Sequence, residues 1–172
     1  SVLKPYIFHD AVAFANATWA AKLAGRALNS SGEQMPAEEV CHHLMRHGTH
    51  HVRPERVDKA FPGGVFDTQS WAVVLETKNL PKALGCWVSP VQSILSEWRC
   101  WVIGGKVVEV SQYRANGTMC VQRETRMDIH DAAQHLANIH LPTSCVVLDM
   151  AFTPNGFRVV EFNPIHSSGW YA

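Results

Sequence analysis

Two pairs of strand-like segments, each joined by a short turn sequence, constrain the fold of this chain most. Residues 97–103 and 106–113 flank Gly104-Gly105, and residues 145–151 and 157–162 flank Thr153-Pro154-Asn155-Gly156. Turns of this composition join adjacent antiparallel strands, because glycine tolerates positive φ and proline suits the second position of a type I turn. The sequence therefore predicts two β-hairpins.

The segments outside these hairpins predict helices and further strands. Asp10 caps an expected helix over residues 11–28, Pro36 begins a second helix that ends near Gly48, and Asp128 caps a third that reaches about residue 140. Residues 29–35 are expected to form a loop, and strands are expected at residues 50–53, 71–75 and 86–89. This order of elements is α+β, not a doubly wound parallel sheet.

The charge and cysteine content exclude several classes of protein. The chain has 15 basic residues (lysine and arginine) and 15 acidic residues (aspartate and glutamate). Without an excess of basic residues, the composition does not predict a nucleic-acid or membrane partner. No stretch reaches the roughly 20 apolar residues that span a bilayer, and we expect no signal peptide. The five cysteines are irregularly spaced without a CxxC pair, which favours reduced thiols in a cytoplasmic protein.

The final hairpin carries a candidate cation site. Glu161 and Asn163 are two positions apart and share one face of their strand. A three-residue loop that pairs Thr153 with Phe157 would place Asp149 opposite Glu161, on the same face. The three side chains would then offer oxygen ligands to magnesium, although solvent-facing strand residues are an alternative. A two-residue loop that pairs Asp149 with Phe162 would break this set.

The middle hairpin carries a candidate phosphate clamp. With Gly104-Gly105 as the turn, counting back predicts the pairs Ile103 with Lys106, Glu97 with Gln112, and Arg99 with Val110. One face would then present Glu97, Arg99, Gln112 and Arg114. A guanidinium binds two phosphate oxygens at once, so this face suits a polyphosphate. A cross-strand salt bridge on a solvated sheet face is the alternative.

The motifs of residues 50–172 resemble those of ATP-grasp proteins in the clade named for two arginines and a lysine. The matching stretches, in the order of that clade, are Val52-Arg53-Pro54, Asp58-Lys59-Ala60-Phe61, Gly63-Gly64, Glu97-Trp98-Arg99, Ser111-Gln112-Tyr113-Arg114, Asn116-Gly117, Leu148-Asp149, Val160-Glu161-Phe162-Asn163, Ser167-Ser168-Gly169 and Tyr171. No single motif is specific, but the ordered set is.

The resemblance implies an ATP-grasp fold, in which two α+β lobes with antiparallel sheets hold ATP between them. It implies a preceding helical segment at residues 1–48, a lid lobe with its hinge strand at 49–89, and a catalytic lobe at 90–172. Members carry a further N-terminal segment, so the chain is expected to begin inside it. Residues 61–64 would form a flexible lid, and residues 86–89 would lie along the adenine.

The resemblance, together with the hairpin faces, assigns roles to individual residues. Arg99 and Lys59 are the expected catalytic residues. The expected ATP-binding residues are Arg53, Lys59, Trp87, Val88, Glu97, Arg99, Gln112 and Arg114. The expected Mg²⁺ ligands are Asp149, Glu161 and Asn163.

The activity that the resemblance implies is that of an ATP- and Mg²⁺-dependent ligase. A substrate carboxylate would attack the γ-phosphate of ATP, and the acyl phosphate would accept an amine. Peptides, amino acids and small metabolites remain open as substrates. One alternative is a nucleotide-binding module without catalysis. Another is a zinc-binding interaction domain built on His42, His43, His47, His50 and His51, for which a solvated helix end is the plainer interpretation.

Overall fold

The computed structural model describes residues 10–56 and 60–169, and these divide into two compact units. The four-stranded unit contains residues 15–17 and 29–91. The five-stranded unit contains residues 10–14, 18–28 and 92–169. The expected α+β class with antiparallel sheets is confirmed.

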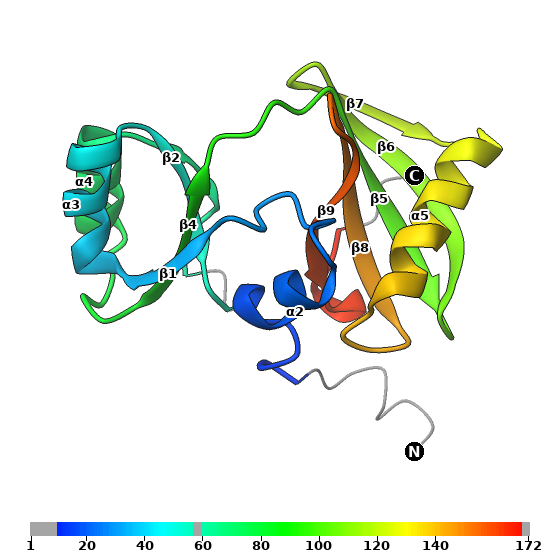
Figure 1. Ribbon diagram of the computed structural model, residues 1–172, viewed down its shortest axis with the longest axis horizontal. Helices are drawn as coiled ribbons and strands as arrows, with labels where there is room; N and C mark the ends of the chain where they lie inside the picture. The colour runs from blue at the N-terminus through cyan, green and yellow to red at the C-terminus, as the bar shows by residue number, and fades with distance from the viewer. Residues whose placement is uncertain (1–9, 57–59, 170–172) are drawn as a thin grey trace. The chain divides into compact units, whose positions relative to one another are not determined.

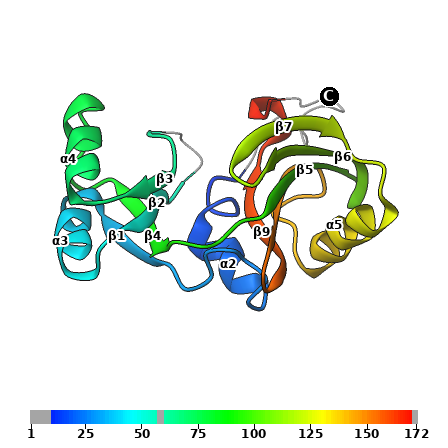
Figure 2. The same cartoon turned by 90° about the horizontal axis from the view of Figure 1, so that it is seen from above.

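The four-stranded unit is an antiparallel sheet with two helices on one face (Figures 1 and 2). Its strand order is β1-β4-β2-β3, with β1 at Glu33–Pro36, β2 at His50–Pro54, β3 at Gly64–Phe66 and β4 at Gly85–Pro90. The helices are α3 at Ala37–His47 and α4 at Thr68–Thr77. Their buried side chains pack on Val52, Cys86 and Val88 from the central strands.

Helix α3 is the predicted helix between Pro36 and Gly48. Pro36 is extended at the N-cap, and Glu38 and Glu39 lie in the first turn, where the helix dipole favours acidic groups. At the other end, the Gly48 N–H donates to the Leu44 carbonyl from a residue with φ +78°. Such a φ favours glycine, which is why the helix stops there.

The strand predicted at residues 71–75 is wrong, because these residues belong to helix α4. The Asp67 side chain accepts from the Ser70 N–H while the Ser70 hydroxyl accepts from the Asp67 N–H, which forms a capping box. From that start, Trp71, Val74 and Leu75 have the spacing of one helical face and pack into the core. The apparent alternation is misleading, since Val73, its middle member, is exposed and lies off this face.

The division of the chain differs from the expected boundary at residue 48. Residues 29–35, expected to be a loop, contain most of strand β1, and the predicted helix that follows is α3; both belong to the four-stranded unit rather than to a separate preceding segment. Strand β1 pairs with β4 from Glu33↔Val88 to Pro36↔Gly85. This pairing ties residues 33–36 to the sheet that residues 50–90 complete.

The five-stranded unit is an antiparallel sheet in the order β7-β6-β5-β8-β9. Its strands are β5 at Ser96–Ile103, β6 at Lys106–Ala115, β7 at Thr118–Arg123, β8 at Val146–Thr153 and β9 at Gly156–Asn163. Helix α5, at Met127–Ile139, lies beside β6 (Figure 1), and a short 3₁₀ helix, η1, spans Ile165–Ser167. Both predicted hairpins are present, and β7 is an additional strand. It follows the Asn116-Gly117 turn, in which both residues have positive φ.

The N-terminal helix is shorter than the predicted span of residues 11–28. Helix α2 covers Asn16–Lys22, and Ala24 and Gly25 then take positive φ, which ends the helix. The chain next runs along β9, where the Leu28 N–H donates to the Val159 carbonyl at 2.7 Å. Trp19 of α2 meets the ring of Phe162 edge-on, with 5.3 Å between ring centroids. Segments 18–28 and 156–163 thus share one core.

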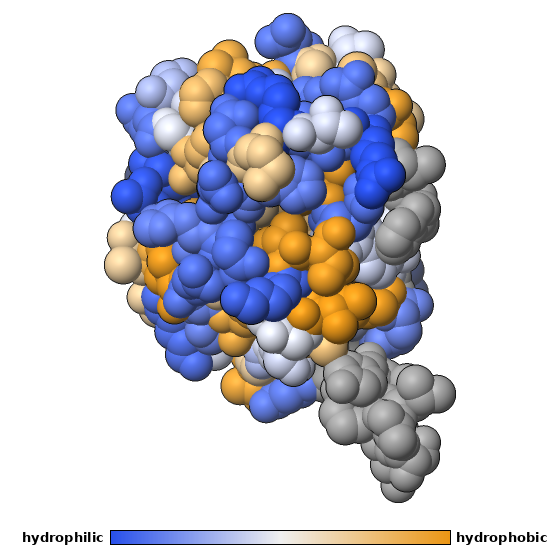
Figure 3. Space-filling view, turned by 90° about the vertical axis from the view of Figure 1, so that its right-hand side faces the viewer, coloured by the Kyte–Doolittle hydropathy of each residue, from blue (hydrophilic) through white to orange (hydrophobic). Residues whose placement is uncertain are grey.

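The surface shown in Figure 3 carries apolar groups among hydrophilic ones. Exposed apolar side chains of the five-stranded unit include Val108, Met119, Val121 and Met127. Within the described residues, no helix combines the length and the apolar character needed to cross a membrane.

Candidate active site

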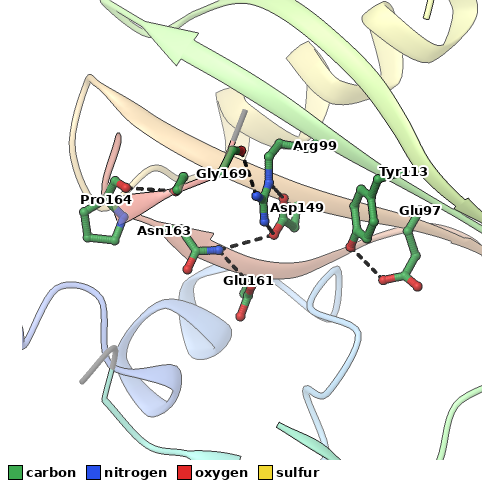
Figure 4. A network of polar contacts seen from close by, with 9 residues as sticks. Glu97, Arg99, Tyr113, Asp149, Glu161, Asn163, Pro164 and Gly169 are labelled. Carbon is green, nitrogen blue, oxygen red and sulfur yellow. Dashed lines mark hydrogen bonds and ion pairs between the residues drawn. The ribbon is translucent and has the colours of Figure 1, made fainter. Parts of the chain in front are cut away.

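Asp149, Glu161 and Asn163 converge on one point of the β8–β9 hairpin (Figure 4). The Asn163 Nδ2 donates to Glu161 Oε1 at 2.8 Å and to Asp149 Oδ2 at 3.3 Å. Asp149 is 1% exposed. A half-turn of the Asn163 amide would bring Oδ1 to the same point, so all three side chains can present oxygen there. This donor set fits a hard divalent cation such as Mg²⁺.

The predicted pairing of Asp149 with Glu161 is confirmed, but the predicted loop is wrong. Thr153 pairs with Gly156, so the turn has two loop residues rather than three. A register shift between Asp149 and Met150 then compensates: Met150 pairs with Val159 and Asp149 with Glu161, which leaves Val160 as an extra residue. This β-bulge returns Glu161 to the face of Asp149.

Arg99 of β5 forms a buried ion pair with Asp149 on the neighbouring strand β8. Its Nε donates to Oδ1 at 2.8 Å and its Nη2 to Oδ2 at 2.7 Å. The remaining Nη1 donates to the Gly169 carbonyl at 3.0 Å. Arg99 is 9% exposed. The two-point geometry fixes the guanidinium plane beside the carboxylates.

A second carboxylate network adjoins Arg99 on the same sheet face. The Tyr113 hydroxyl donates to Glu97 Oε2 at 2.7 Å, and Arg114 Nη1 lies 3.3 Å from Glu97 Oε1. The Arg99 guanidinium carbon lies 5.8 Å from the centre of the Tyr113 ring. Tyr113 belongs to one of the motifs that resemble the ATP-grasp clade, but the sequence alone assigns it no role. The available signal is its position two residues after Ser111, which places both residues on one face of the strand.

The prediction that Gln112 shares a face with Glu97 and Arg99 is wrong. Gln112 pairs with Trp98, on the opposite face, and its Oε1 accepts from the Gln122 Nε2 at 2.7 Å. A register shift between Trp101 and Val102 pairs Arg99 with Ser111 rather than Val110. A second shift, between Glu97 and Trp98, pairs Glu97 with Arg114. The pair of Ile103 with Lys106 at the turn is as predicted.

Burial dominates the electrostatics of this site. It raises the pKa of Asp149 above its ordinary range; Arg99 opposes the rise, and nearby Glu161 adds to it. Burial also raises the pKa of Tyr113 far above its usual value, with the charge of Asp149 as the next cause and that of Glu97 after it. Tyr113 therefore stays a neutral hydrogen-bond donor. Because a nearby cation favours the ionised carboxylate, the site is electrostatically suited to a divalent metal.

The other expected nucleotide contacts lie in the four-stranded unit. Arg53 on β2 pairs with Trp87 on β4, and a Cβ atom on Gly63 would lie 3.0 Å from the Arg53 Cβ. The Trp87 indole donates to the Asn29 carbonyl at 3.1 Å, whereas the Val88 side chain lies in the core. Phe61, expected to belong to a flexible lid, is also in that core. Lys59 lies outside the described residues.

Three of the clustered histidines pack against one another near the C-terminal end of α3, with His43 and His47 on the helix and His50 at the start of β2. The ring centroid of His43 lies 4.6 Å from that of His47 and 4.7 Å from that of His50. In the part of the chain that the structure describes, no group of three or more His, Cys, Asp or Glu side chains is arranged to hold a metal. The zinc alternative therefore has no geometric support among these residues.

Comparison with known sequences identifies a family. The profile of the ATP-grasp domain, family 3 of the clade named for two arginines and a lysine, matches residues 10–172. No curated protein sequence matches the chain.

Solved structures of ATP-grasp proteins, two of them ligases, share the fold. The D-alanine–D-alanine ligase of Bacillus anthracis aligns with a TM-score of 0.65 at 9% identity, covering 90% of this chain and 57% of that protein. A RimK domain ATP-grasp protein from Sphaerobacter thermophilus gives 0.64 at 15% identity, covering 88% and 59%. The ligase PsnB, complexed with a minimal precursor, Mg and ADP, gives 0.57 at 15% identity, covering 91% and 51%. The chain spans between half and three fifths of these proteins.

Proposed function

This chain belongs to family 3 of the ATP-grasp clade named for two arginines and a lysine, and we propose that it is the ATP-binding and catalytic part of a ligase. The reaction is the Mg²⁺- and ATP-dependent activation of a substrate carboxylate as an acyl phosphate, which an amine then attacks. The acid and amine are small molecules or peptides. The fold shared with known ATP-grasp ligases supports this class of reaction.

The observation that carries the proposal is the convergence of Asp149, Glu161 and Asn163 beside Arg99. A fold alone does not specify an activity, so the argument depends on this site. Two carboxylates, an amide and a guanidinium combine cation ligands with a phosphate-binding group. The structure of PsnB was solved with Mg and ADP, which supports the binding of Mg²⁺ and an adenine nucleotide by this chain.

The residues of the chain would contribute position and charge rather than a nucleophile. Asp149, Glu161 and Asn163 would hold Mg²⁺, which would neutralise charge on the phosphoryl oxygens. Arg99 would orient the transferred phosphoryl group, with the sheet fixing its guanidinium plane. Arg53, Lys59 and the backbone of β4 at Trp87 and Val88 would contact the nucleotide, and Glu97 and Arg114 would border the phosphates. We assign no nucleotide contact to Gln112, because its side chain lies on the opposite face of the sheet.

The cysteines bear on the cellular setting. All five are free thiols, which supports a reducing compartment such as the cytoplasm.

The deciding experiment is calorimetric titration with ATP in the presence and absence of Mg²⁺. We expect binding by the wild-type chain with Mg²⁺, and a loss of affinity of at least tenfold, about 1.4 kcal/mol, in Glu161→Gln. The matched control is Asp128→Asn, which removes an exposed carboxylate of α5. Equal binding by the wild type and Glu161→Gln would reject the hairpin as the metal site.

A second measurement separates a ligase from a nucleotide-binding module without catalysis. A ligase releases phosphate from ATP only when suitable acids and amines are supplied together, so a screen of carboxylates and amines with phosphate detection is informative. Mg²⁺-dependent ATP binding without phosphate release from any pair would favour the module.

A further inference from the structure

Tyr113 lies at an irregularity of β6. Glu97 pairs with Arg114 and Trp98 with Gln112, so Tyr113 is left between two ladder positions. The β6–β7 ladder has a matching shift between Gln112 and Arg114. Bulges of this kind re-aim a side chain without breaking the sheet. Tyr113 remains on the face of Ser111 and is brought over Arg99.

The side chain of Tyr113 joins two charged groups that do not contact each other directly in the network of Figure 4. Its hydroxyl donates to Glu97 at 2.7 Å, and its ring faces the Arg99 guanidinium at 5.8 Å. The latter distance is within the range of a cation–π interaction, about 6 Å. A hydrogen bond from the phenol to a buried carboxylate also shifts electron density into the ring. Glu97 therefore strengthens the attraction between the ring and Arg99.

The geometry points to Tyr113 as a positioning residue for Arg99. Asp149 fixes the guanidinium within its own plane through two hydrogen bonds, and Tyr113 restrains it perpendicular to that plane. The chain Glu97–Tyr113–Arg99–Asp149 thus orients the phosphate-binding group without a direct contact between Tyr113 and the substrate. The phosphate-binding role of Arg99 rests on the proposed function, but the restraint of its side chain does not.

A packing role alone would have different consequences. If Tyr113 only filled space, its loss would lower stability but leave the hydrogen bonds of Arg99 as protected as before. A positioning role predicts that the loss of Tyr113 speeds exchange of the Arg99 Nε proton. Arg99 would then release Asp149 more often, and each release exposes that proton to water.

The test is proton exchange at the Arg99 Nε by ¹⁵N NMR, on the nucleotide-free chain, with the signal assigned through Arg99→Lys. Removing the ring in Tyr113→Leu is expected to speed exchange about tenfold, which corresponds to about 1.4 kcal/mol and lies between the exposed and the desolvated values for a cation–π contact. Tyr113→Phe keeps the ring but loses the Glu97 bond, and we expect a smaller increase of about threefold. This second variant retains the test if Tyr113→Leu does not fold.

The matched control is Phe157→Leu, which removes an aromatic ring that packs against Trp98 on the opposite face. It is expected to lower the thermal midpoint while leaving Arg99 exchange within about twofold of wild type. If Tyr113→Leu, or Tyr113→Phe when the former is unfolded, behaves like this control, Tyr113 is packing only and the inference is overturned.

Calorimetry with ATP and Mg²⁺ on the same variants separates this inference from the proposed function. If the wild type binds ATP, its affinity should be lower in Tyr113→Phe and lower still in Tyr113→Leu. Unchanged ATP affinity in both variants would also overturn the positioning role. If the wild type does not bind ATP, the proposed function fails, and the exchange measurement alone decides the role of Tyr113.

Discussion

At the scale of single residues, the site depends on charges that have been removed from water. Arg99 and Asp149 are both almost fully buried. Their two hydrogen bonds to each other, and the further hydrogen bonds to Asn163 and Gly169, offset the cost of removing the two charges from water. A buried ion pair of this kind adds little net stability, but removing one partner leaves the other charge unpaired. Stability and site geometry are therefore coupled at these residues.

Replacing Asp149 by Asn should lower the free energy of unfolding by about 3 kcal/mol, because Arg99 would keep its charge without a carboxylate. Urea denaturation measures the loss. The control Asp128→Asn breaks an exposed pair with Arg126 and should change the midpoint little. If Asp149→Asn is as stable as the wild type, Arg99 and Asp149 do not form an ionised pair of structural importance.

At the scale of elements, β-bulges and turn geometry place the functional side chains. Gly156 closes the β8–β9 turn with φ +89°, which an L side chain adopts only with strain. Thr153 supports the turn, since its hydroxyl accepts from the Asn155 N–H and donates to the Gly156 carbonyl. The extra residue Val160 then corrects the register for Glu161.

Gly156→Ala should therefore lower the free energy of unfolding by about 1–2 kcal/mol, the cost of a left-handed conformation for a residue with a Cβ. Chemical denaturation tests this value. Asn155→Ala is the neighbouring control, since Asn155 does not have positive φ. A Gly156→Ala variant as stable as Asn155→Ala would show that the turn relaxes without strain.

The end of α3 predicts a pH dependence of stability. The pKa of His43 is lowered, first by burial and then by His50 and His47; Arg46 adds to this and Glu33 opposes it. The folded state thus binds fewer protons than the unfolded state, so this stability is present above the unfolded histidine pKa of about 6.5 and is lost as the pH falls below it through the lower folded pKa. His43→Gln should reduce the stability difference between about pH 7.5 and pH 5.5 measured by urea denaturation.

An exposed histidine provides the control for that measurement. His135 lies on the outer side of α5, so His135→Gln should retain the wild-type pH dependence. If His43→Gln and His135→Gln have the same pH dependence as the wild type, the histidine cluster makes no contribution.

The same scale shows what the sequence could predict. Glycine turns and alternating residues reveal both hairpins, because those signals are local. The bulges at Val108, Tyr113 and Val160 leave no local signal, since they depend on how neighbouring strands pair. The predicted face of Gln112 is wrong because of the bulge at Val108, between the turn and Gln112. Trp71, Val73 and Leu75 alternate as in a strand, although the Asp67–Ser70 capping box specifies a helix. The predicted pairing of Asp149 with Glu161 is right only because two differences from the prediction cancel: the loop is one residue shorter, and the bulge at Val160 adds one residue.

At the scale of the whole molecule, the chain order and the compact units do not coincide. The five-stranded unit takes residues 18–28 from one end of the chain and residues 92–169 from the other, with the four-stranded unit inserted between them. The edge of β9 is covered by Arg26 to Leu28, and Trp19 packs on Phe162. The catalytic candidates of this unit thus rest on a core that distant segments complete.

A fragment of residues 92–172 should accordingly fail to fold, with exposed apolar surface that binds a hydrophobic dye. A chain in which a flexible Gly-Ser linker replaces residues 29–91 should recover a cooperative thermal transition, since it restores segment 18–28. Circular dichroism on both proteins gives the comparison. A cooperative transition in the shorter fragment would show that segment 18–28 is dispensable.

The pairing of Leu28 with Val159 also sets the timing of folding during synthesis. The ribosome makes β9 about 130 residues after Leu28, which at roughly 5–20 residues per second is a delay of about 6–26 seconds. The inserted four-stranded unit can emerge and fold within that interval, while segment 18–28 waits with the apolar face of Trp19 uncovered. A nascent chain of this design therefore depends on whatever shields that short segment until the last hairpin leaves the exit tunnel.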